Sequence, residues 1–193
     1  MKKKNIFSLS LTALMIALCY ISFTFLKVSI PTPLGYTSFH LGNTFLILAS
    51  LLLGGVLGGI AGAIGMGIGD LLDPVYVLVA PKTIFLKMMI GLATGFFAHK
   101  VYKIGKLEGK ELSKKVFLSS FFGICANIIG EPCFGYLYYK YILNMPEKAL
   151  KALFSFNLMS TSVNAVLAVV IASSLYLLVR KRFKNSSYSS LIR

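Results

Sequence analysis

A glycine-dense apolar tract that runs directly into a group of charges constrains the fold of this chain more than any other stretch. Its glycines recur four residues apart, in the pairs Gly54/Gly58, Gly55/Gly59, Gly58/Gly62 and Gly65/Gly69. Glycines at this spacing remove the side chains that keep helices apart, so helix backbones approach closely within lipid. The tract ends at Asp70, and the charges that follow it must face protein or water rather than hydrocarbon. We therefore predict a closely packed helix that ends at a polar mouth.

The composition predicts an integral membrane protein. Hydrophobic residues make up 56% of the 193 residues and charged residues 13%, with a mean hydropathy of +0.79. Ordinary soluble domains are less apolar and carry about 25% charged residues. The chain has 20 Lys and Arg against 6 Asp and Glu, and 14 of the 20 basic residues lie in the segments 2–4, 100–115 and 180–193. The positive-inside rule places such segments on the cytoplasmic side, which accounts for the net charge of +14 without a nucleic-acid partner.

Charge also decides the number of predicted helices. Residues 41–72 form an apolar stretch of 32 residues, which is too long for one membrane span of about 20 residues and short for two. One span there places the two basic ends of the chain on opposite sides, whereas two short helices turning near Gly54 and Gly55 place all basic segments on one side. We therefore predict an all-α integral membrane protein, a compact bundle of six transmembrane helices with cytoplasmic N and C termini.

The predicted bundle is a single domain that covers residues 1–193. Its helices are expected at about residues 6–26, 41–53, 56–72, 83–98, 116–138 and 154–179. The first apolar run is interpreted as a span rather than a cleaved signal, because it has spanning length and no small-residue cleavage site follows. Between the first two helices, Pro31, Pro33 and Gly35 rule out a helix, and we expect an ordered loop on the outer side.

This topology gathers nearly all intramembrane polarity in the outer half of the bundle. A charge at bilayer depth costs at least about 2.5–3.5 kcal/mol, so such residues usually pair or line a water-filled cavity. We predict a substrate pocket that opens to the outside and includes aromatic residues able to stack on a flat ring. The candidate substrate-binding residues are Tyr36, His40, Asn43, Asp70, Lys87, Asn127, Glu131, Tyr136, Asn157 and Asn164. Asp70, Asp73 and Lys82 are expected to frame the entrance.

A structural role is the alternative for individual charges in this set. An ion pair between Lys87 and Glu131, or between Lys82 and Asp70, would tie helices together without touching a ligand. For any one pair this is the simpler interpretation, whereas the convergence of the whole group favours a pocket.

The sequence argues against several functions. There is no catalytic motif and no ATP-binding motif, so we do not predict an enzyme, and active uptake would need energy from a partner. The three cysteines and two histidines lack metal-ligand spacing, so neither a metal nor a cofactor is predicted. A stand-alone secondary transporter or channel for a small polar solute remains the alternative, although it would need polar residues through the full membrane depth.

The order of these features resembles the substrate-binding S component of an energy-coupling factor (ECF) vitamin transporter. The resemblance is carried by the Ala13/Ala17 pair in ALMIA, by LLLGGVLGGIAGAIGMGIGDLLDP and by APKTIFLKMMIGLATGF. Within that family the chain is most similar to the riboflavin-type branch, whose members serve several vitamins or vitamin precursors, including pyridoxine-like ones.

The resemblance implies a role and a set of partners. It implies high-affinity capture of a water-soluble vitamin, pyridoxine-like or another B vitamin such as riboflavin, at the outer face of the bacterial cytoplasmic membrane. The loop between the first two helices would act as a lid. Ala13 and Ala17 would then dock onto a transmembrane coupling subunit driven by two cytoplasmic ATPases. The spacing of Ala13 and Ala17 alone fits packing inside the bundle equally well.

Overall fold

The computed structural model describes residues 2–32 and 35–183, so the outermost residues of the predicted domain and Pro33 lie outside the described part. In chain order the main elements are α1 (Lys2–Thr24), β1 (Lys27–Thr32), β2 (Gly35–His40), α2 (Gly42–Leu53), α3 (Gly55–Leu71), α4 (Ala80–Gly95), α5 (Gly109–Gly130) and α6 (Glu147–Phe183). Short helical segments extend or connect them: η1 (Val77–Val79), η2 (Phe96–Val101), η3 (Ile104–Lys106), η4 (Glu131–Gly135) and η5 (Tyr138–Ile142).

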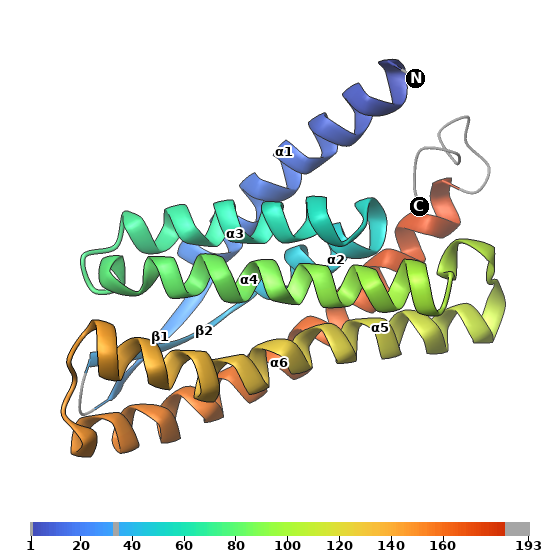
Figure 1. The fold of residues 1–193 in the computed structure, drawn as a ribbon. Coiled ribbons are helices and arrows are strands. Elements are labelled where there is room, and N and C mark those ends of the chain that lie inside the picture. Colours follow the sequence, from blue (N-terminus) through green and yellow to red (C-terminus); the bar gives the residue numbers. More distant parts are fainter. Residues whose placement is uncertain (1, 33–34, 184–193) are drawn as a thin grey trace.

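The helices form one bundle with two distinct ends (Figure 1). We call the end that carries β1, β2 and the connections from α3 to α4 and from α5 to α6 the hairpin end. The opposite end, which we call the basic end, carries the connection from α4 to α5. There the guanidinium of Arg180 donates hydrogen bonds to the carbonyls of Ile104, Gly105 and Leu107, at 2.6–3.0 Å. These bonds hold the last turns of α6 against that connection.

The predicted break between two short helices is confirmed at Gly54. α2 ends at Leu53 and α3 begins at Gly55, with Gly54 alone between them at a φ of 96°. This left-handed conformation is open to glycine at little steric cost. Every residue of α2 except Phe45 is buried, so α2 lies in the middle of the bundle.

The glycines of α3 pack this helix against three neighbours. Toward α4 the fit is between backbones: a Cβ atom added at Gly91 would overlap the backbone of Gly59, and one at Gly95 would overlap Gly55. Gly58 lies against Ser50 of α2, and other α3 glycines lie against α1. Close approach of this kind is what glycines four residues apart permit, so the prediction of a closely packed helix is confirmed.

The described elements are helical, as expected of an all-α membrane protein, except at residues 27–40, where we predicted an ordered loop and the structure has a β-hairpin. β1 and β2 pair antiparallel, from Lys27 opposite His40 to Thr32 opposite Gly35. Val28, Ile30 and Phe39 supply the β-branched and aromatic residues that favour strands. Pro31 excludes a helix but not this sheet, because in a sheet of two strands every strand is an edge strand.

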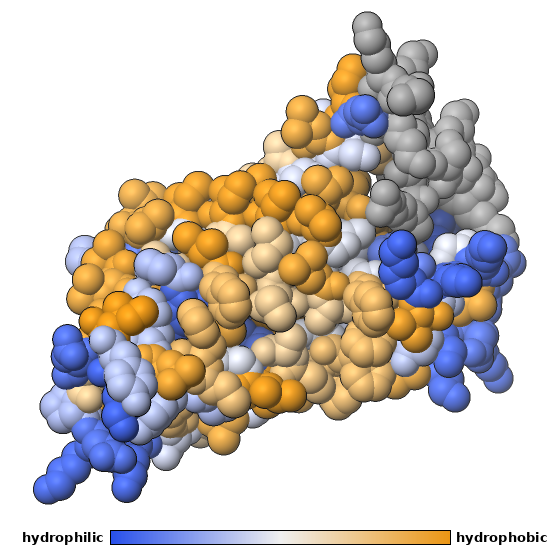
Figure 2. All heavy atoms as spheres, viewed as in Figure 1, coloured by the Kyte–Doolittle hydropathy of each residue, from blue (hydrophilic) through white to orange (hydrophobic). Residues whose placement is uncertain are grey.

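Helices α4, α5 and α6 begin earlier than predicted. α4 begins at Ala80 instead of Thr83, α5 at Gly109 instead of Val116, and α6 spans Glu147–Phe183. Within residues 2–32 and 35–183, four helical stretches are long and apolar enough to cross a membrane: Asn5–Thr24, Val77–Val101, Gly109–Ile142 and Glu147–Arg182. α2 and α3 are shorter apolar helices. Figure 2 shows an apolar surface between two hydrophilic ends, as expected of a protein that lies across a bilayer.

Candidate functional site

Polar side chains from the whole bundle meet in one cavity at the hairpin end. The cavity has a volume of about 130 Å³. Nine of the ten predicted substrate-binding residues line it: Tyr36, His40, Asn43, Asp70, Lys87, Asn127, Glu131, Asn157 and Asn164. The tenth, Tyr136, lines a neighbouring cavity of about 310 Å³, which shares Glu131 and Asn157 with the first. The structure thus brings the predicted residues together, while their contact with a ligand stays a prediction.

One wall of the cavity is held by an ion pair between α4 and η4. The Nζ atom of Lys82 lies 2.8 Å from Oε2 of Glu131, and the side chains are only 5% and 16% exposed. The same ammonium lies 5.0 Å from the centre of the Tyr139 ring. Lys82 therefore pairs with Glu131, and neither of the two ion pairs considered from the sequence forms. The reason is register: α4 and α5 run antiparallel, so the first turn of α4 is level with the end of α5.

Lys87 lies five residues further along α4 and has no such partner. Its side chain is buried, with 6% exposed, and its Nζ atom lies 3.5 Å from Oδ1 of Asn127. Among the described residues no carboxylate lies within 4.0 Å of this ammonium. An ammonium offers three donors, and this long contact uses one of them. Lys87 therefore brings unused hydrogen-bonding capacity into the cavity.

Two buried acceptors line the same cavity from α2 and α3. Asp70 is 2% exposed and hydrogen-bonds with the side chain of Thr83, but no lysine of the described residues lies within 4.0 Å of its carboxylate. Asn43 is also 2% exposed, and its Oδ1 atom is buried without a hydrogen-bond partner in the described part of the chain. Buried polar atoms in folded proteins are nearly always satisfied. An acceptor that is unsatisfied beside a cavity therefore points to a ligand or water as its partner.

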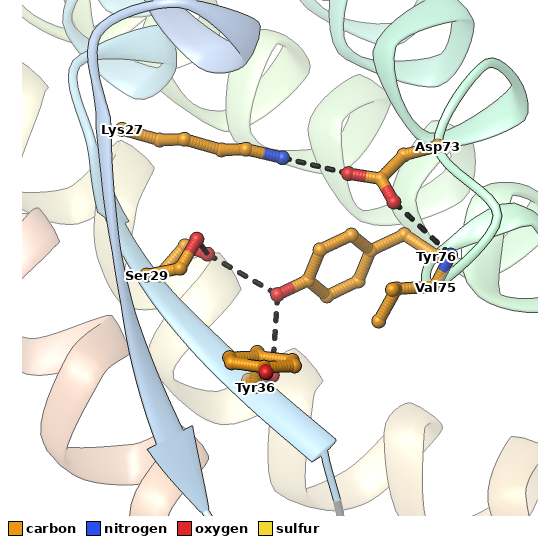
Figure 3. A network of polar contacts seen from close by, with 7 residues as sticks. Lys27, Ser29, Tyr36, Asp73, Val75 and Tyr76 are labelled. Carbon is orange, nitrogen blue, oxygen red and sulfur yellow. Dashed lines mark hydrogen bonds and ion pairs between the residues drawn. The ribbon is translucent and has the colours of Figure 1, made fainter.

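The hairpin is fastened over the cavity by contacts that we call the clasp. Nζ of Lys27 lies 2.7 Å from Oδ2 of Asp73, in the connection after α3. The hydroxyl of Tyr76, from the same connection, donates to the Tyr36 carbonyl at 3.2 Å and lies 3.2 Å from Oγ of Ser38. Figure 3 shows how Lys27 and Asp73 approach each other beside the Tyr76 ring. The clasp joins β1 and β2 to the residues between α3 and α4.

The charge of Lys27 favours the ionised form of Asp73. Partial burial on its own raises the pKa of Asp73, but the hydrogen bond and charge of Lys27, together with the Val75 N–H donated at 3.0 Å, lower that pKa below its ordinary value. Asp73 is therefore a carboxylate at neutral pH, and the clasp contains a full ion pair.

A second set of contacts ties the hairpin to α6. The amide of Asn164 accepts from the His40 N–H and donates to the Ser38 carbonyl, both at 3.0 Å. The hydroxyls of Thr37 and Ser160 lie 2.6 Å apart. Both polar ends of the Asn164 amide are thus bonded to the β2 backbone. Its place in the cavity wall is fixed by the hairpin, and a ligand could reach it only through the second N–H of Nδ2 or the remaining lone pair of Oδ1.

His40 is neutral in this setting. Burial lowers the pKa of its imidazole, and the nearby charges of Lys87 and Lys27 lower it further, well below the ordinary range. Its Nδ1 atom accepts the Gly42 N–H at 3.2 Å, which places the ring proton on Nε2. The Phe23 ring packs edge-on against it, with ring centres 4.7 Å apart. His40 therefore contributes no charge to the cavity.

The Ala13/Ala17 pair lies on the outside of the bundle. Both alanines are exposed, whereas Met15 and Cys19, on the other side of α1, are buried. Packing inside the bundle, the alternative left open by the sequence, is therefore excluded for this pair. Docking to a partner remains a prediction, and none of the described residues buries this surface of α1.

Nearly the whole chain matches one protein family. The family model described as ECF-type riboflavin transporter, S component, matches residues 3–181. The chain belongs to this family. Comparison with curated proteins and with solved structures gives no match.

Membership fixes the general role of the cavity. S components are substrate-binding subunits of vitamin transporters that associate with an ECF module, and they are not enzymes. The resemblance seen in the sequence and the prediction of a non-enzymatic transport protein are therefore confirmed. The apolar helices fit a multi-pass membrane protein.

Several residues of this S component's cavity were not predicted. The missed lining residues are Phe23, Lys27, Thr37, Ser38, Tyr76, Val79, Thr83, Tyr139, Leu153, Ser160 and Thr161. Lys27 carried a usable signal, because a lysine on the side predicted to be non-cytoplasmic runs against the positive-inside rule and suggests a specific partner. The hydroxyl residues of α6 carried none, because small hydroxyl residues are common in membrane helices and only the position of the hairpin brings them into the site.

Proposed function

We propose that this S component captures a water-soluble vitamin or vitamin precursor at the outer face of the bacterial cytoplasmic membrane. The ligand is a pyridoxine-like compound or another B vitamin such as riboflavin, and an ATP-driven ECF module completes its import. The observation that carries this proposal is the cavity of buried, incompletely bonded polar groups beneath the clasped hairpin. Ligand sites typically combine apolar walls with a few convergent polar groups of this kind.

The proposed orientation has six spans, counting the short helices α2 and α3, with both termini in the cytoplasm. The start of α1 and the last described turns of α6 lie toward the same end of the bundle as the connection from α4 to α5 (Figure 1). Basic residues lie at all three places: residues 2–4, the segment 100–115, and Arg180, Lys181 and Arg182. The positive-inside rule then puts the basic end in the cytoplasm and the hairpin end outside.

The direct test is mass spectrometry of the small molecule that co-purifies with the detergent-solubilised protein. A B vitamin or vitamin precursor is the expected result. The control is the same preparation after exhaustive dialysis against ligand-free buffer, to which riboflavin and pyridoxine are added back separately. Protein that carries no vitamin and binds neither compound would contradict the proposal.

For coupling, we propose that the outward face of Ala13 and Ala17 docks onto a transmembrane coupling subunit that is driven by two cytoplasmic ATPases. Small residues four apart allow a partner helix to approach closely, and in this chain that space is not filled. Replacing both alanines with leucine should abolish vitamin uptake in cells that contain the module and leave vitamin binding by the purified protein unchanged.

A matched pair of substitutions on another lipid-facing surface controls for general effects. Val166 and Val170 of α6 are also four residues apart and are 65% and 51% exposed, and Val166→Leu/Val170→Leu should leave uptake intact. Loss of binding in the alanine variant would show that the pair supports the fold rather than docking. Vitamin flux into liposomes by the wild-type chain alone would support the stand-alone transporter instead.

A further inference from the structure

We propose that the ligand of this cavity carries no net charge, and that it offers a hydrogen-bond acceptor to Lys87 and a hydrogen-bond donor to Asp70 or Asn43. The site would then select the free vitamin over its phosphate ester. This inference rests on the proposed function and adds the charge and the polarity of the ligand to it.

The first argument is the charge balance of the site. Three lysines line the cavity, namely Lys27, Lys82 and Lys87. Two of them are neutralised by carboxylates, at 2.7 Å from Asp73 and at 2.8 Å from Glu131. The third carboxylate, Asp70, is buried in the cavity wall, and His40 is neutral. The site therefore holds equal numbers of positive and negative groups, and a ligand that brought net charge would upset this balance in a buried setting.

The second argument is the unused capacity of Lys87. Its ammonium is buried but makes only the 3.5 Å contact with Asn127. Burying a charged group without partners is strongly unfavourable. A carbonyl, hydroxyl or ring nitrogen of the ligand would supply the missing acceptor, and a charge-assisted bond of this kind is short and strong.

The third argument is that acceptors with remaining hydrogen-bonding capacity face the same space. The unpartnered Oδ1 atom of Asn43 and the carboxylate of Asp70 come from α2 and α3, whereas Lys87 comes from α4. A ligand that fits both sets needs a donor as well as an acceptor. Heteroaromatic rings with hydroxyl, carbonyl or imide groups have this character, and simple anions and simple cations do not.

A phosphate ester fits these conditions poorly. Its group of nearly two negative charges would find one unpaired ammonium, that of Lys87, and would share the cavity with the unpaired carboxylate of Asp70. Like charges brought together in a buried site repel strongly because water does not screen them. The lysines that could otherwise bind phosphate, Lys27 and Lys82, are already engaged by carboxylates.

The test compares matched ligands on the wild-type protein in lipid nanodiscs. Dissociation constants are measured by calorimetry for riboflavin against riboflavin 5′-phosphate, and for pyridoxine against pyridoxine 5′-phosphate. Whichever vitamin binds, its phosphate should bind at least 100-fold more weakly. A phosphate that binds as tightly as the free vitamin overturns the inference and leaves the proposed function standing. If none of the four compounds binds, the proposed function fails for these vitamins and the inference fails with it.

Two substitutions then locate the effect. Lys87→Gln and Asp70→Asn should each weaken binding of the free vitamin about ten- to hundredfold, as expected for the loss of a hydrogen bond to a charged group. Asp70→Asn should also reduce, at least tenfold, the ratio of the dissociation constant of the phosphate to that of the free vitamin. A purely structural role of Asp70 would leave this ratio unchanged. Lys148 is an exposed lysine at the same end of the bundle, and Lys148→Gln should change neither the affinity for the free vitamin nor the ratio of the two dissociation constants. Unchanged affinity in both site variants overturns the assignment, and a variant that fails to fold leaves the wild-type ratio to decide it.

Discussion

Helices α3 and α4 meet in two different ways along their length. Toward the basic end their backbones touch, because Gly55 and Gly59 lie directly against Gly91 and Gly95. Toward the hairpin end polar side chains stand between the helices and the rest of the bundle, and a cavity of about 130 Å³ remains. One pair of helices thus contains a seam of direct backbone contact and a site whose hydrogen bonds are incomplete.

The comparison separates stability from binding. A contact between backbones cannot adapt by rotating a side chain, so the seam fixes the distance and angle between the two helices. The cavity end can be arranged by side chains alone, because the seam already holds the helices in place. Substitutions in the seam should therefore affect folding, and substitutions around the cavity should affect binding more than folding.

The largest expected effect is in the seam. Gly91→Ala places a Cβ atom against the backbone of Gly59, where neither partner can move aside. We expect a loss of about 3 kcal/mol or more, at the upper end of the cost of overpacking. Thermal unfolding in detergent measures the change.

Gly130→Ala is the matched control for the seam. A Cβ atom there meets only the Cδ2 atom of Leu86, at 2.6 Å, which is the end of a flexible side chain. The same substitution should change stability by less than about 1 kcal/mol, because alanine also favours the helix by roughly that amount. Equal destabilisation by the two variants would show that the seam is not special.

The next largest effect concerns the Lys82–Glu131 pair. Lys82→Met leaves Glu131 nearly buried without a counter-charge. We expect a loss of about 2 kcal/mol, below the ~3–5 kcal/mol seen for fully buried pairs because water can enter the cavity. The double variant Lys82→Met/Glu131→Met should recover most of this stability but not vitamin binding, as followed by thermal unfolding and calorimetry. A double variant as unstable as the single variant would show that this ion pair, like the glycine contacts between α3 and α4, mainly supports folding rather than binding.

A smaller effect is expected at the clasp. Asp73→Asn removes an ion pair whose side chains are 22% and 25% exposed, and pairs of this kind contribute about 0.2–1 kcal/mol. The vitamin should dissociate up to about fivefold faster, and the unfolding temperature should hardly change. Stopped-flow fluorescence of the co-purified vitamin measures the rate, and an unchanged rate would show that the clasp does not restrain the hairpin.

The same pair gives the clasp a predictable pH dependence. The pKa of Asp73 is lowered in the closed structure. The stabilisation that its carboxylate gives the closed hairpin is therefore fully present above the ordinary pKa of 3.8 and is lost as the pH falls through the lowered pKa. The ionisation of Asp73 should therefore not change the rate of vitamin release between about pH 5 and 8. Below about pH 4 its protonation should make release faster. In Asp73→Asn this acceleration should disappear.

The smallest effect is expected for Tyr76→Phe. The lost hydroxyl makes two contacts of 3.2 Å with the hairpin, both near solvent. Vitamin release should change by less than about threefold, within the range of a single exposed hydrogen bond. A larger change than in Asp73→Asn would mean that the tyrosine, and not the ion pair, closes the hairpin.

Sequence alone predicted only the α3 half of the seam. The glycine spacing of α3 and the charge pattern correctly gave a break at Gly54 and a tightly packed helix. The partners Gly91 and Gly95 were not identified, because their importance depends on the antiparallel register of α3 and α4. That register is a property of the folded bundle and not of either helix.

The site shows the same limit. Its members could be collected because charge and amide groups in apolar helices are costly unless they meet. Their pairing could not be predicted, since Lys82 and Lys87 both lie on α4 and only the height of Glu131 on the neighbouring helix selects Lys82. The hairpin was missed because its prolines exclude a helix but do not reveal which segments pair.

The single-residue break at Gly54 also has a consequence for the surrounding lipid. At about 1.5 Å per residue, the 12 residues of α2 and the 17 of α3 extend only ~18 Å and ~25 Å, against a hydrocarbon core of about 30 Å. α2 is hidden from lipid, but α3 exposes Val56, Ile64 and Ile68 to it. With α3 as one of the six proposed spans, we expect the bilayer beside it to become thinner, at a small elastic cost for each ångström of mismatch. A partner that covered this side would relieve the deformation, so membrane thickness itself would bias the protein toward or away from assembly.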